Sequence, residues 1–513
     1  AEGVEVQGRV IDTMITGAIV NENRYSYSLN NLGNDYLGEK KDEKLLRVAA
    51  AEWGLDPKAE MYVLPPEFVG RYAEQDAGMT LRLWERLKIE LDKQDLWNIW
   101  ELETSLIPMM LNMRQLGVRV DLDKAEKAKE YFKVKSKELH SEIHRQTGIR
   151  IEPWSASSVA GVFDRLELIY PKTEAGKPSF TKQYLNSHAH PVAQMIVRLR
   201  EFDKADSTFI DTILKHEHQG RIHCEFHQLR NDGGGTVTGR FSSSNPNLQQ
   251  IPSRVPEIKK LIRGLFIPEE GTRWGSFDYS SQEPRLLVHF AASLNDGLRH
   301  PMVDKIVEQY HTSDVDLHQM TADIAGIKRK EAKVVNLGIM YGMGKAKLGD
   351  QLGISVEEAG ELLMLHREKV PFVKDLADLA SKQAEKHGQI RTLLGRRCRF
   401  DMWQPRTFGF KKPLPYEQAL KEYGQPLKRS FTYKALNKLI QGSAADQTKK
   451  AMADCYSEGL LPMLTVHDEL CFSVESDDQA QRIKDIMENG LSDVLKVPSK
   501  VDDELKSNWG EIE

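Results

Sequence analysis

Two acidic residues, Asp278 and Asp468, stand where the sequence predicts strands to end. Asp468 lies within LTVHDELCFSV, residues 464–474, in which two apolar runs with strand-like alternation flank His-Asp-Glu. In one continuous strand Asp468 and Glu469 would face opposite sides of the sheet, and one carboxylate would lose its hydration. A hairpin avoids that cost by placing both at its tip. We therefore predict a hairpin whose acidic tip is either a solvated turn or half of a metal site.

The other half of such a site would come from RWGSFDYSSQEPRLLVHFAA, in which a buried strand is predicted to end at Asp278 and a helix to begin near Pro284. Ser280-x-x-Glu283 matches a capping box, which gives Glu283 a structural role. Two strand-end carboxylates of one sheet can share two divalent cations about 3.5–4 Å apart, the arrangement that catalyses in-line phosphoryl transfer. Mg²⁺ suits it because this ion keeps positions for water and substrate phosphates.

A phosphate-rich substrate also needs fixed positive charge, which IKRKEAKVVNLGIMYGMGK can supply. Arg329, Lys333, Leu337 and Tyr341 recur every fourth residue, so they form one stripe over about 18 Å of a helix. The cationic end can hold a triphosphate, and Tyr341 followed by Gly342 offers a ring on which a base can stack. The same stripe also fits an ordinary amphipathic helix with a basic rim.

Composition places limits on the rest of the chain. Its 513 residues, 29% charged and 40% hydrophobic, are typical of a globular protein with about three or four domains. Because the net charge is −5, a polyanionic partner must be held by local basic clusters. The four cysteines form no C-x-x-C pair, no apolar run is long enough to span a bilayer, and the first residues lack a signal peptide. These features predict a cytosolic location and no membrane partner.

The three segments DYSSQEPR, RKEAKVVNLGIMYG and VHDE, in this order, resemble motifs A, B and C of the DNA polymerase I family (family A DNA polymerases). Further segments resemble the family at 200–209 (REFDKADSTF), 238–254 (TGRFSSSNPNLQQIPSR), 316–322 (DLHQMTA) and 441–446 (QGSAAD). Composition alone would make much of 231–254 a flexible linker. The resemblance covers essentially residues 100–513.

The resemblance implies an α+β fold of the right-hand polymerase type, with an antiparallel sheet in the palm. The implied division is a partial α/β 3′→5′ exonuclease-like segment at 1–98, thumb at 99–235, palm at 236–299 and 401–513, and fingers at 300–400. It also implies the activity, which is template-directed addition of deoxynucleoside triphosphates to the 3′ end of primer–template DNA.

The resemblance further implies roles for single residues. Asp278 and Asp468 match the two Mg²⁺-binding aspartates, Tyr279 is counted with the metal ligands, Glu469 supports them, and Lys333 is the expected proton donor to pyrophosphate. Expected nucleotide contacts are His318, Arg329 and Lys333 at the triphosphate, Leu337 at the sugar, Tyr341 and Gly342 at the templating base, and Glu283 as the block to a ribose 2′-OH. Expected DNA contacts are Arg240, Asn437 and Gln441 in the minor groove, His467 near the primer end, and basic clusters at Arg254, Lys259, Lys260, Arg263 and 391–399.

The chain departs from the family's pattern in two places. YAEQD at 72–76 and IDTM at 11–14 resemble the second half of the proofreading domain, so Asp76 matches a metal ligand whose acidic partners are absent. We therefore expect no proofreading by this chain alone, unless a separate chain completes the domain. Leu337 stands where the family usually has Phe or Tyr, and an aliphatic residue there resembles phage members, which suggests a viral source and the host cytoplasm.

Two other functions compete with this interpretation. A single-subunit RNA polymerase shares the architecture, but Glu283 and the His-Asp-Glu triplet favour DNA synthesis. A catalytically silent nucleic-acid-binding subunit would be expected to have lost a metal ligand, whereas both aspartates are present.

Overall fold

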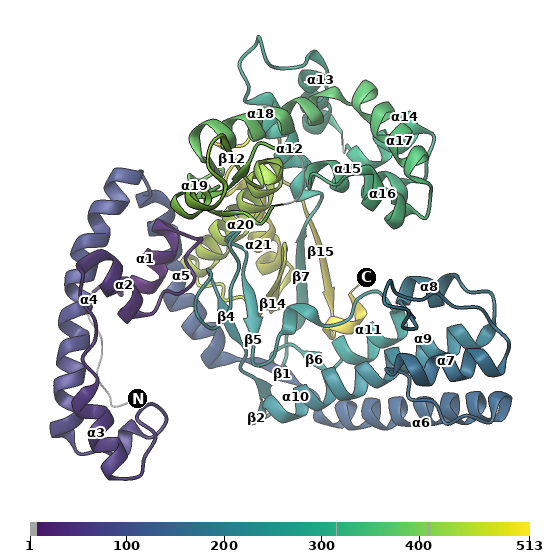
Figure 1. Cartoon of the computed structure of the whole chain (residues 1–513), viewed down its shortest axis with the longest axis horizontal. Coiled ribbons are helices and arrows are strands. Elements are labelled where there is room, and N and C mark those ends of the chain that lie inside the picture. Colours follow the sequence, from purple (N-terminus) through teal and green to yellow (C-terminus); the bar gives the residue numbers. More distant parts are fainter. Residues whose placement is uncertain (1–7, 314, 408–410, 513) are drawn as a thin grey trace.

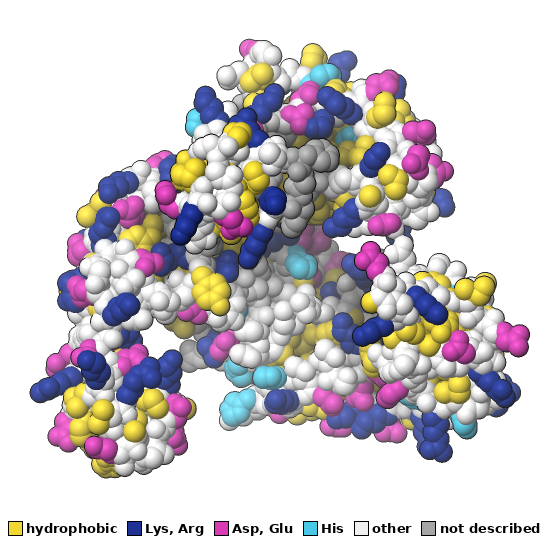
Figure 2. Space-filling model, viewed as in Figure 1, with side chains coloured by type: hydrophobic (Ala, Val, Ile, Leu, Met, Phe, Trp, Pro, Cys, Tyr) yellow, Lys and Arg dark blue, Asp and Glu magenta, His cyan; other side chains and the backbone are white. Residues whose placement is uncertain are grey.

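The structure of the chain, a computed structural model, describes residues 8–313, 315–407 and 411–512. A helical lobe at the N-terminal end, an arm of long helices and a helical lobe at the top of the view surround a central sheet (Figure 1). In the space-filling view the surface is hollowed between the upper lobe and the arm (Figure 2). Among the described helices none is long and apolar enough to cross a membrane.

The central sheet has the strand order β13-β14-β7-β15 and is antiparallel throughout. Its strands are β13 (Leu464–Val466), β14 (Glu469–Val474), β7 (Arg273–Tyr279) and β15 (Val501–Lys506). Trp274 of β7 stacks on Trp509 on one face, and Phe277 packs edge-on against Phe472 on the other. At Gly275 a Cβ would lie 2.5 Å from Val474, so only glycine permits this packing. β7 and β14 are largely buried on both faces, with Asp278 exposed near the end of β7, whereas the edge strand β15 exposes Asp502 and Asp503.

Helices and short elements cover this sheet. They are α12 (Gln282–Ala292), α20 (Ala435–Ser457), α21 (Asp477–Asn489), α11 (Pro256–Arg263) and η5 (Trp509–Glu511). Most of α20 is buried, including Ala444 and Met452, which is the pattern of a helix enclosed by other elements.

α5 (Trp97–Leu116) leads from the N-terminal lobe into the body of the molecule, where it packs against α1 and α20 (Figure 1). The arm contains α6 (Leu122–Thr147), α7 (Ala156–Arg165), α8 (Lys182–Ser187), α9 (Pro191–Lys204), the π-helical turn η2 (Ala205–Ile210) and α10 (Asp211–His216). A small sheet at its base joins β2 (Glu217–His218), β3 (Arg221–Ile222), β1 (Val118–Val120) and β6 (Phe266–Ile267). Next come β4 (Glu225–His227), β5 (Ser242–Ser244) and η3 (Leu248–Gln250). The expectation of a flexible linker at 231–254 is therefore wrong in its second half, because β5 pairs with β4 and Leu248 is fully buried.

The upper lobe consists of α13 (Pro301–Thr312), α14 (Leu317–Ala325), α15 (Arg329–Met340), α16 (Lys345–Leu352), α17 (Val356–Lys369) and α18 (Pro371–His387). Between it and α20 lie β8 (Gln389–Arg391), β9 (Arg397–Arg399), β10 (Met402–Pro405), β11 (Leu414–Pro415), α19 (Tyr416–Tyr423), β12 (Leu427–Arg429) and η4 (Thr432–Lys434).

The N-terminal lobe comprises α1 (Thr13–Val20), α2 (Leu29–Leu37), α3 (Lys44–Glu52), η1 (Met61–Val63) and the long α4 (Pro66–Gln94). Leu83, Leu87 and Leu91 recur every fourth residue along α4 and are fully buried against α1 and α2. Within residues 8–98 the structure contains helices and no strand. The expected α/β character is therefore wrong for this part, because helix-on-helix packing forms its core.

Candidate active site

Asp278 and Asp468 lie at adjacent ends of two paired strands. The β7–β14 register places Glu469 opposite Asp278, so Asp468 precedes the partner of Asp278 by one residue. β13 and β14 are joined by only His467 and Asp468, and His467 adopts a positive φ of 59°. The predicted hairpin is confirmed, and pairing between its strands brings together carboxylates 190 positions apart in the sequence.

The electrostatics of this strand end favour a bound cation. The side chain of Asp278 is accessible to solvent on one side. The protein packed around the rest of it still removes enough water to raise the pKa of its carboxyl well above the usual range. Repulsion from Asp468, Glu469 and Asp502 raises that pKa further, while Lys333 lowers it. Burial likewise raises the pKa of Asp468. A divalent cation would relieve this excess of negative charge, so the aspartates fit the predicted metal site.

The side chains of Glu469 and Tyr279 are both hydrogen-bonded within the protein. Glu469 accepts hydrogen bonds from the Ser276 hydroxyl at 2.6 Å and the Cys471 thiol at 3.3 Å, which hold it along the sheet. The Tyr279 hydroxyl is buried and donates to the carbonyl oxygen of Met487 at 2.9 Å. Only the main chain of Tyr279 is left for a metal, so the prediction is corrected to that extent. No group of three or more His, Cys, Asp or Glu in the described residues is arranged as a metal site, so water and substrate oxygens would have to complete the coordination.

The capping-box interpretation of Glu283 is wrong. α12 begins at Gln282, its N-cap is Ser281, and no side-chain bond caps it. The Glu283 carboxylate instead accepts from Arg240 Nη2 at 2.5 Å and from the Tyr341 hydroxyl at 3.1 Å. Ser280 precedes the N-cap residue and therefore cannot cap the helix. Its N–H instead donates to the carbonyl oxygen of Lys500.

The predicted stripe lies on α15 and its C-cap residue Tyr341, with Arg329 and Lys333 exposed and Leu337 and Tyr341 half-buried. The charge of Lys333 lowers the pKa of Asp278, so this ammonium acts electrostatically on the strand ends. Gly342 follows the helix with a φ of 65°, and a Cβ there would lie 2.9 Å from Tyr433. One end of the stripe therefore acts on the carboxylates and the other packs tightly against η4.

His318 lies on α14 and contacts α15 through a residue that the sequence analysis did not single out. Its Nδ1 is 2.9 Å from Nδ2 of Asn336, a residue inside the stripe segment that no motif singled out. Burial lowers the pKa of His318 to about 4. Asp316 caps α14 and pairs with Arg329 at 2.5 Å. A capping pattern before the helix was the available signal for Asp316.

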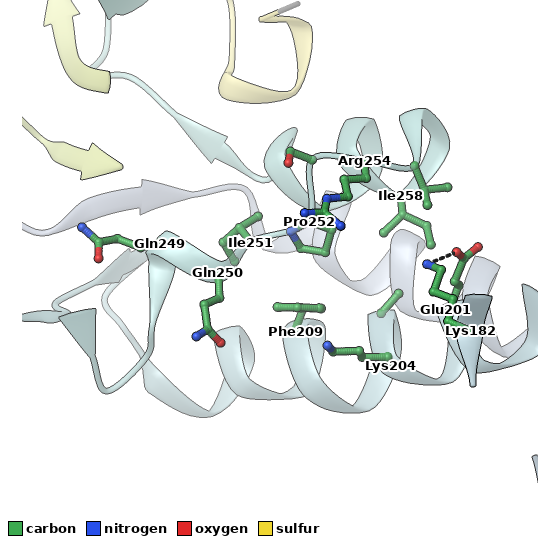
Figure 3. Close-up of a pocket in the computed structure, with 13 residues that line it drawn as sticks. Lys182, Glu201, Lys204, Phe209, Gln249, Gln250, Ile251, Pro252, Arg254 and Ile258 are labelled. Carbon is green, nitrogen blue, oxygen red and sulfur yellow. Dashed lines mark hydrogen bonds and ion pairs between the residues drawn. The ribbon is translucent and has the colours of Figure 1, made fainter. Parts of the chain in front are cut away.

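The predicted DNA contacts fall into two groups. Arg240 and His467 line one small pocket with Gln282, and Gln441 interacts with the Tyr341 hydroxyl one helical turn after Asn437 on α20. Arg254 lies farther away. It lines a groove of about 400 Å³ together with Lys204 and Phe209, between η2 and the segment that follows η3 (Figure 3).

Several basic residues expected to meet DNA are engaged elsewhere. Arg391 donates to the carbonyl oxygens of Gln94 and Asp95 at 2.8 and 2.9 Å, and Arg399 pairs with Glu22. Arg396 is buried, and Arg263 is buried over the Trp509 ring. The expectation is therefore wrong for Arg396 and Arg399, whose guanidinium groups pair with protein carboxylates, and for Arg263, which is buried against a ring.

In the N-terminal lobe Lys41 contacts both Tyr72 and Asp76, the two residues that resemble the exonuclease motif. Lys41 Nζ lies 2.6 Å from Asp76 Oδ2 and 2.6 Å from the Tyr72 hydroxyl. The carboxylate of Asp76 is thus already neutralised by a protein cation.

Comparison with known proteins identifies the family. The sequence model of DNA polymerase family A matches residues 122–511. The DNA-directed DNA polymerase of Pseudomonas phage M6 is 37% identical over 97% of this chain and 79% of its own length. DNA polymerase DpoZ of Acinetobacter phage SH-Ab 15497 is 30% identical over 96% of this chain and 82% of its own length.

Among solved structures, the POL domain of Pol1 from M. smegmatis, in complex with DNA primer-template and dNTP, matches with a TM-score of 0.76 and 26% identity. The match covers 97% of this chain and 82% of that one. The predicted α+β polymerase fold and the predicted likeness to phage enzymes are confirmed. The chain belongs to family A of the DNA polymerases.

Proposed function

We propose that this chain synthesises DNA on a template by adding deoxynucleotides to the 3′ end of a primer and releasing pyrophosphate. The observation that carries the proposal is the meeting of Asp278 and Asp468 at adjacent strand ends, where the charge of Lys333 of α15 also acts on Asp278. Two neighbouring carboxylates that can share divalent cations are what nucleotidyl transfer requires, and basic groups elsewhere would hold the duplex.

Asp278 and Asp468 would hold two Mg²⁺ ions, which supply charge stabilisation to the attacking and leaving oxygens. The cations of Arg329 and Lys333 and the imidazole of His318 would bind the triphosphate, and Lys333 would give a proton to the departing pyrophosphate. Tyr341 and Gly342 would receive the templating base. Glu469 would support the aspartates.

On the DNA side, Arg240, Asn437 and Gln441 would contact minor-groove acceptors that are similar in all base pairs. His467 would lie near the primer end, and Arg254 beside Lys204 would meet backbone phosphates. The division into thumb (99–235), palm (236–299 and 401–513) and fingers (300–400) belongs to this proposal. Because the relatives are phage enzymes, we also propose that the chain acts in the cytoplasm of a bacterial host.

The direct test is extension of a labelled primer on a DNA template with Mg²⁺ and either deoxy- or ribonucleotides. We expect template-complementary extension with deoxynucleotides. Preferential use of ribonucleotides would favour an RNA polymerase, and tight DNA binding without extension would favour a silent binding subunit.

Glu283 is predicted to select the sugar. Glu283→Ala should raise the use of ribonucleotides relative to deoxyribonucleotides by about 10-fold or more, because the carboxylate would no longer clash with a ribonucleotide's 2′-OH or leave that hydroxyl unpaired. Glu283→Gln, which keeps the volume of the side chain, is the matched control and should retain most of the discrimination. Single-nucleotide kcat/KM values measure both, and equal ratios in all three proteins would refute this role.

Leu337 is predicted to cause discrimination against dideoxynucleotides. It lies one turn from Lys333 and one from Tyr341, and it has no group to replace the hydrogen bond that a missing 3′-OH removes. That loss costs about 1–3 kcal/mol, or roughly 5- to 150-fold. Leu337→Tyr should therefore raise dideoxynucleotide incorporation, whereas Leu337→Phe should change it little. Equal discrimination in all three proteins would leave Leu337 as a packing residue.

Proofreading is predicted to be absent from this chain alone. Lys41 neutralises Asp76, and one carboxylate cannot hold the metal cluster that hydrolysis of a 3′ nucleotide requires. Incubation with single-stranded DNA and Mg²⁺ should leave its 3′ end intact. Degradation that disappears in Asp76→Ala would contradict this, and activity that appears only with a second polypeptide would indicate a split domain.

A further inference from the structure

A buried hydrogen-bond network centred on Asn336 joins three helices of the upper lobe. Asn336 of α15 places Nδ2 3.3 Å from the carbonyl oxygen of Leu317 and 2.9 Å from Nδ1 of His318, both on α14. Its Oδ1 lies 2.9 Å from Nε2 of His366 on α17. Asn336, His318 and His366 are each at most 5% exposed. Polar groups this deeply buried are held in one arrangement, because breaking a bond leaves its partner unsatisfied.

The chemistry of these contacts determines where the hydrogens lie. A backbone carbonyl can only accept, so the group of Asn336 that faces Leu317 must be the NH₂. The same NH₂ faces His318 Nδ1, which must then be an unprotonated acceptor, and the ring proton is on Nε2. On the other side, Oδ1 of Asn336 accepts the Nε2 proton of His366. The Nδ1 of His366 is then without a proton, and it is buried without a partner among the described residues.

We propose that Asn336, oriented by His366, is a positioning residue that keeps His318 in the Nε2–H tautomer, so that a neutral imidazole donates a hydrogen bond to the triphosphate of the incoming nucleotide. This inference rests on the proposed function, in which His318 contacts that triphosphate. Nε2 of His318 has no hydrogen bond within the described part of the chain and is not among its buried unpaired atoms, so it can reach a ligand.

The surroundings of His318 make the tautomer matter. The charged groups that act on it are Asp316, which caps its own helix, and Arg329 and Lys333 on α15. Burial is the main cause that lowers its pKa to about 4, and the two cations add to this effect while Asp316 opposes it. The ring is therefore neutral near pH 7. A neutral ring with its proton on Nδ1 would present a lone pair to a phosphate oxygen and repel it.

The tautomer can be observed without any activity. Nitrogen-15 NMR of protein labelled at histidine, with the His318 signals assigned by their loss in His318→Gln, should show Nε2 protonated and no titration from about pH 6 to 8. In Asn336→Asp the new carboxylate accepts from Nδ1 and favours the imidazolium, so His318 should titrate in this range. An Nδ1–H ring in the parent protein, or an unchanged signal in Asn336→Asp, would overturn the proposal. A parent protein that shows the tautomer but extends no primer would refute the proposed function alone.

Kinetics test the consequence. Asn336→Ala should raise the KM for deoxynucleotides about 10-fold, the value of one hydrogen bond to a charged group, with a smaller change in kcat. His366→Phe should shift KM in the same direction, and His366→Gln, which keeps a donor, should restore it. Ser355→Ala is the matched control, since it removes the cap of α17 without touching the network. A KM in Asn336→Ala no higher than in Ser355→Ala would contradict the positioning role.

Discussion

Replacing Asp468 with alanine is expected to slow primer extension by several orders of magnitude while leaving the affinity for primer–template nearly unchanged. Asp468 and Asp278 are the carboxylates that strand pairing brings together, and without either the proposed two-cation site would lose a ligand. The charge that stabilises the transition state is then absent, whereas DNA is held mainly through its phosphates by basic groups elsewhere. Single-turnover extension and fluorescence anisotropy measure the two quantities separately.

The matched control for this variant is Asp503→Ala. Asp503 lies on β15 of the same sheet, one residue beyond the partner of Asp278, and forms an ion pair with Lys484 at 2.7 Å. Its side chain therefore points to the other face. Extension by this variant should stay within about 10-fold of the parent rate, since an exposed ion pair contributes little. Robust extension by Asp468→Ala would refute the metal assignment.

The largest loss of stability is expected from Glu103→Ala. Glu103 on α5 is fully buried and contacts Lys449 Nζ at 2.7 Å and Arg396 Nη2 at 2.5 Å, while Arg396 also pairs with Asp446 at 2.8 Å. The two carboxylates balance the two cations. Removing Glu103 leaves one buried cation uncompensated, which costs about 3–5 kcal/mol in the free energy of unfolding.

Glu101→Ala is the control for this measurement, because Glu101 lies two residues away on the same helix but is exposed and pairs with Arg9 at the surface. It should cost less than about 1 kcal/mol. Urea unfolding of both variants, followed by fluorescence and compared by midpoint, tests the difference. Equal midpoints would contradict the expectation that removal of Glu103 leaves a costly uncompensated charge.

The buried cluster of Glu103, Arg396, Asp446 and Lys449 also contacts the segment that carries Arg240 of the candidate active site. Arg396 packs under Gly239, where a Cβ would lie 2.7 Å from its Nε, and Arg240 is the next residue. Glu103→Ala should therefore also weaken extension in protein that remains folded. Comparing extension at equal folded fraction separates this effect from unfolding.

The elements that carry the candidate site were predictable because their signals are local. Apolar alternation around a polar triplet predicts the β13–β14 hairpin, and a four-residue recurrence predicts α15. Their order along the chain, matched to the family's motifs, was enough to assign Asp278 and Asp468 to one centre. Period and spacing alone favoured a solvated turn with an acidic tip.

The partners of the polar groups were decided only by the tertiary structure. A capping box is a local pattern, but Glu283 is taken by Arg240 and Tyr341, 43 and 58 residues away. Glu103 stands in a helix with other charged residues, and nothing in its spacing distinguishes it from the exposed Glu101. In the sequence the basic run at 391–399 resembles a DNA-binding cluster. In the fold Arg396 and Arg399 pair with carboxylates of distant segments. The physical reason is common to all three: local periodicity sets which face of an element is apolar, whereas the energy of a charge depends on which groups from elsewhere in the chain replace its water.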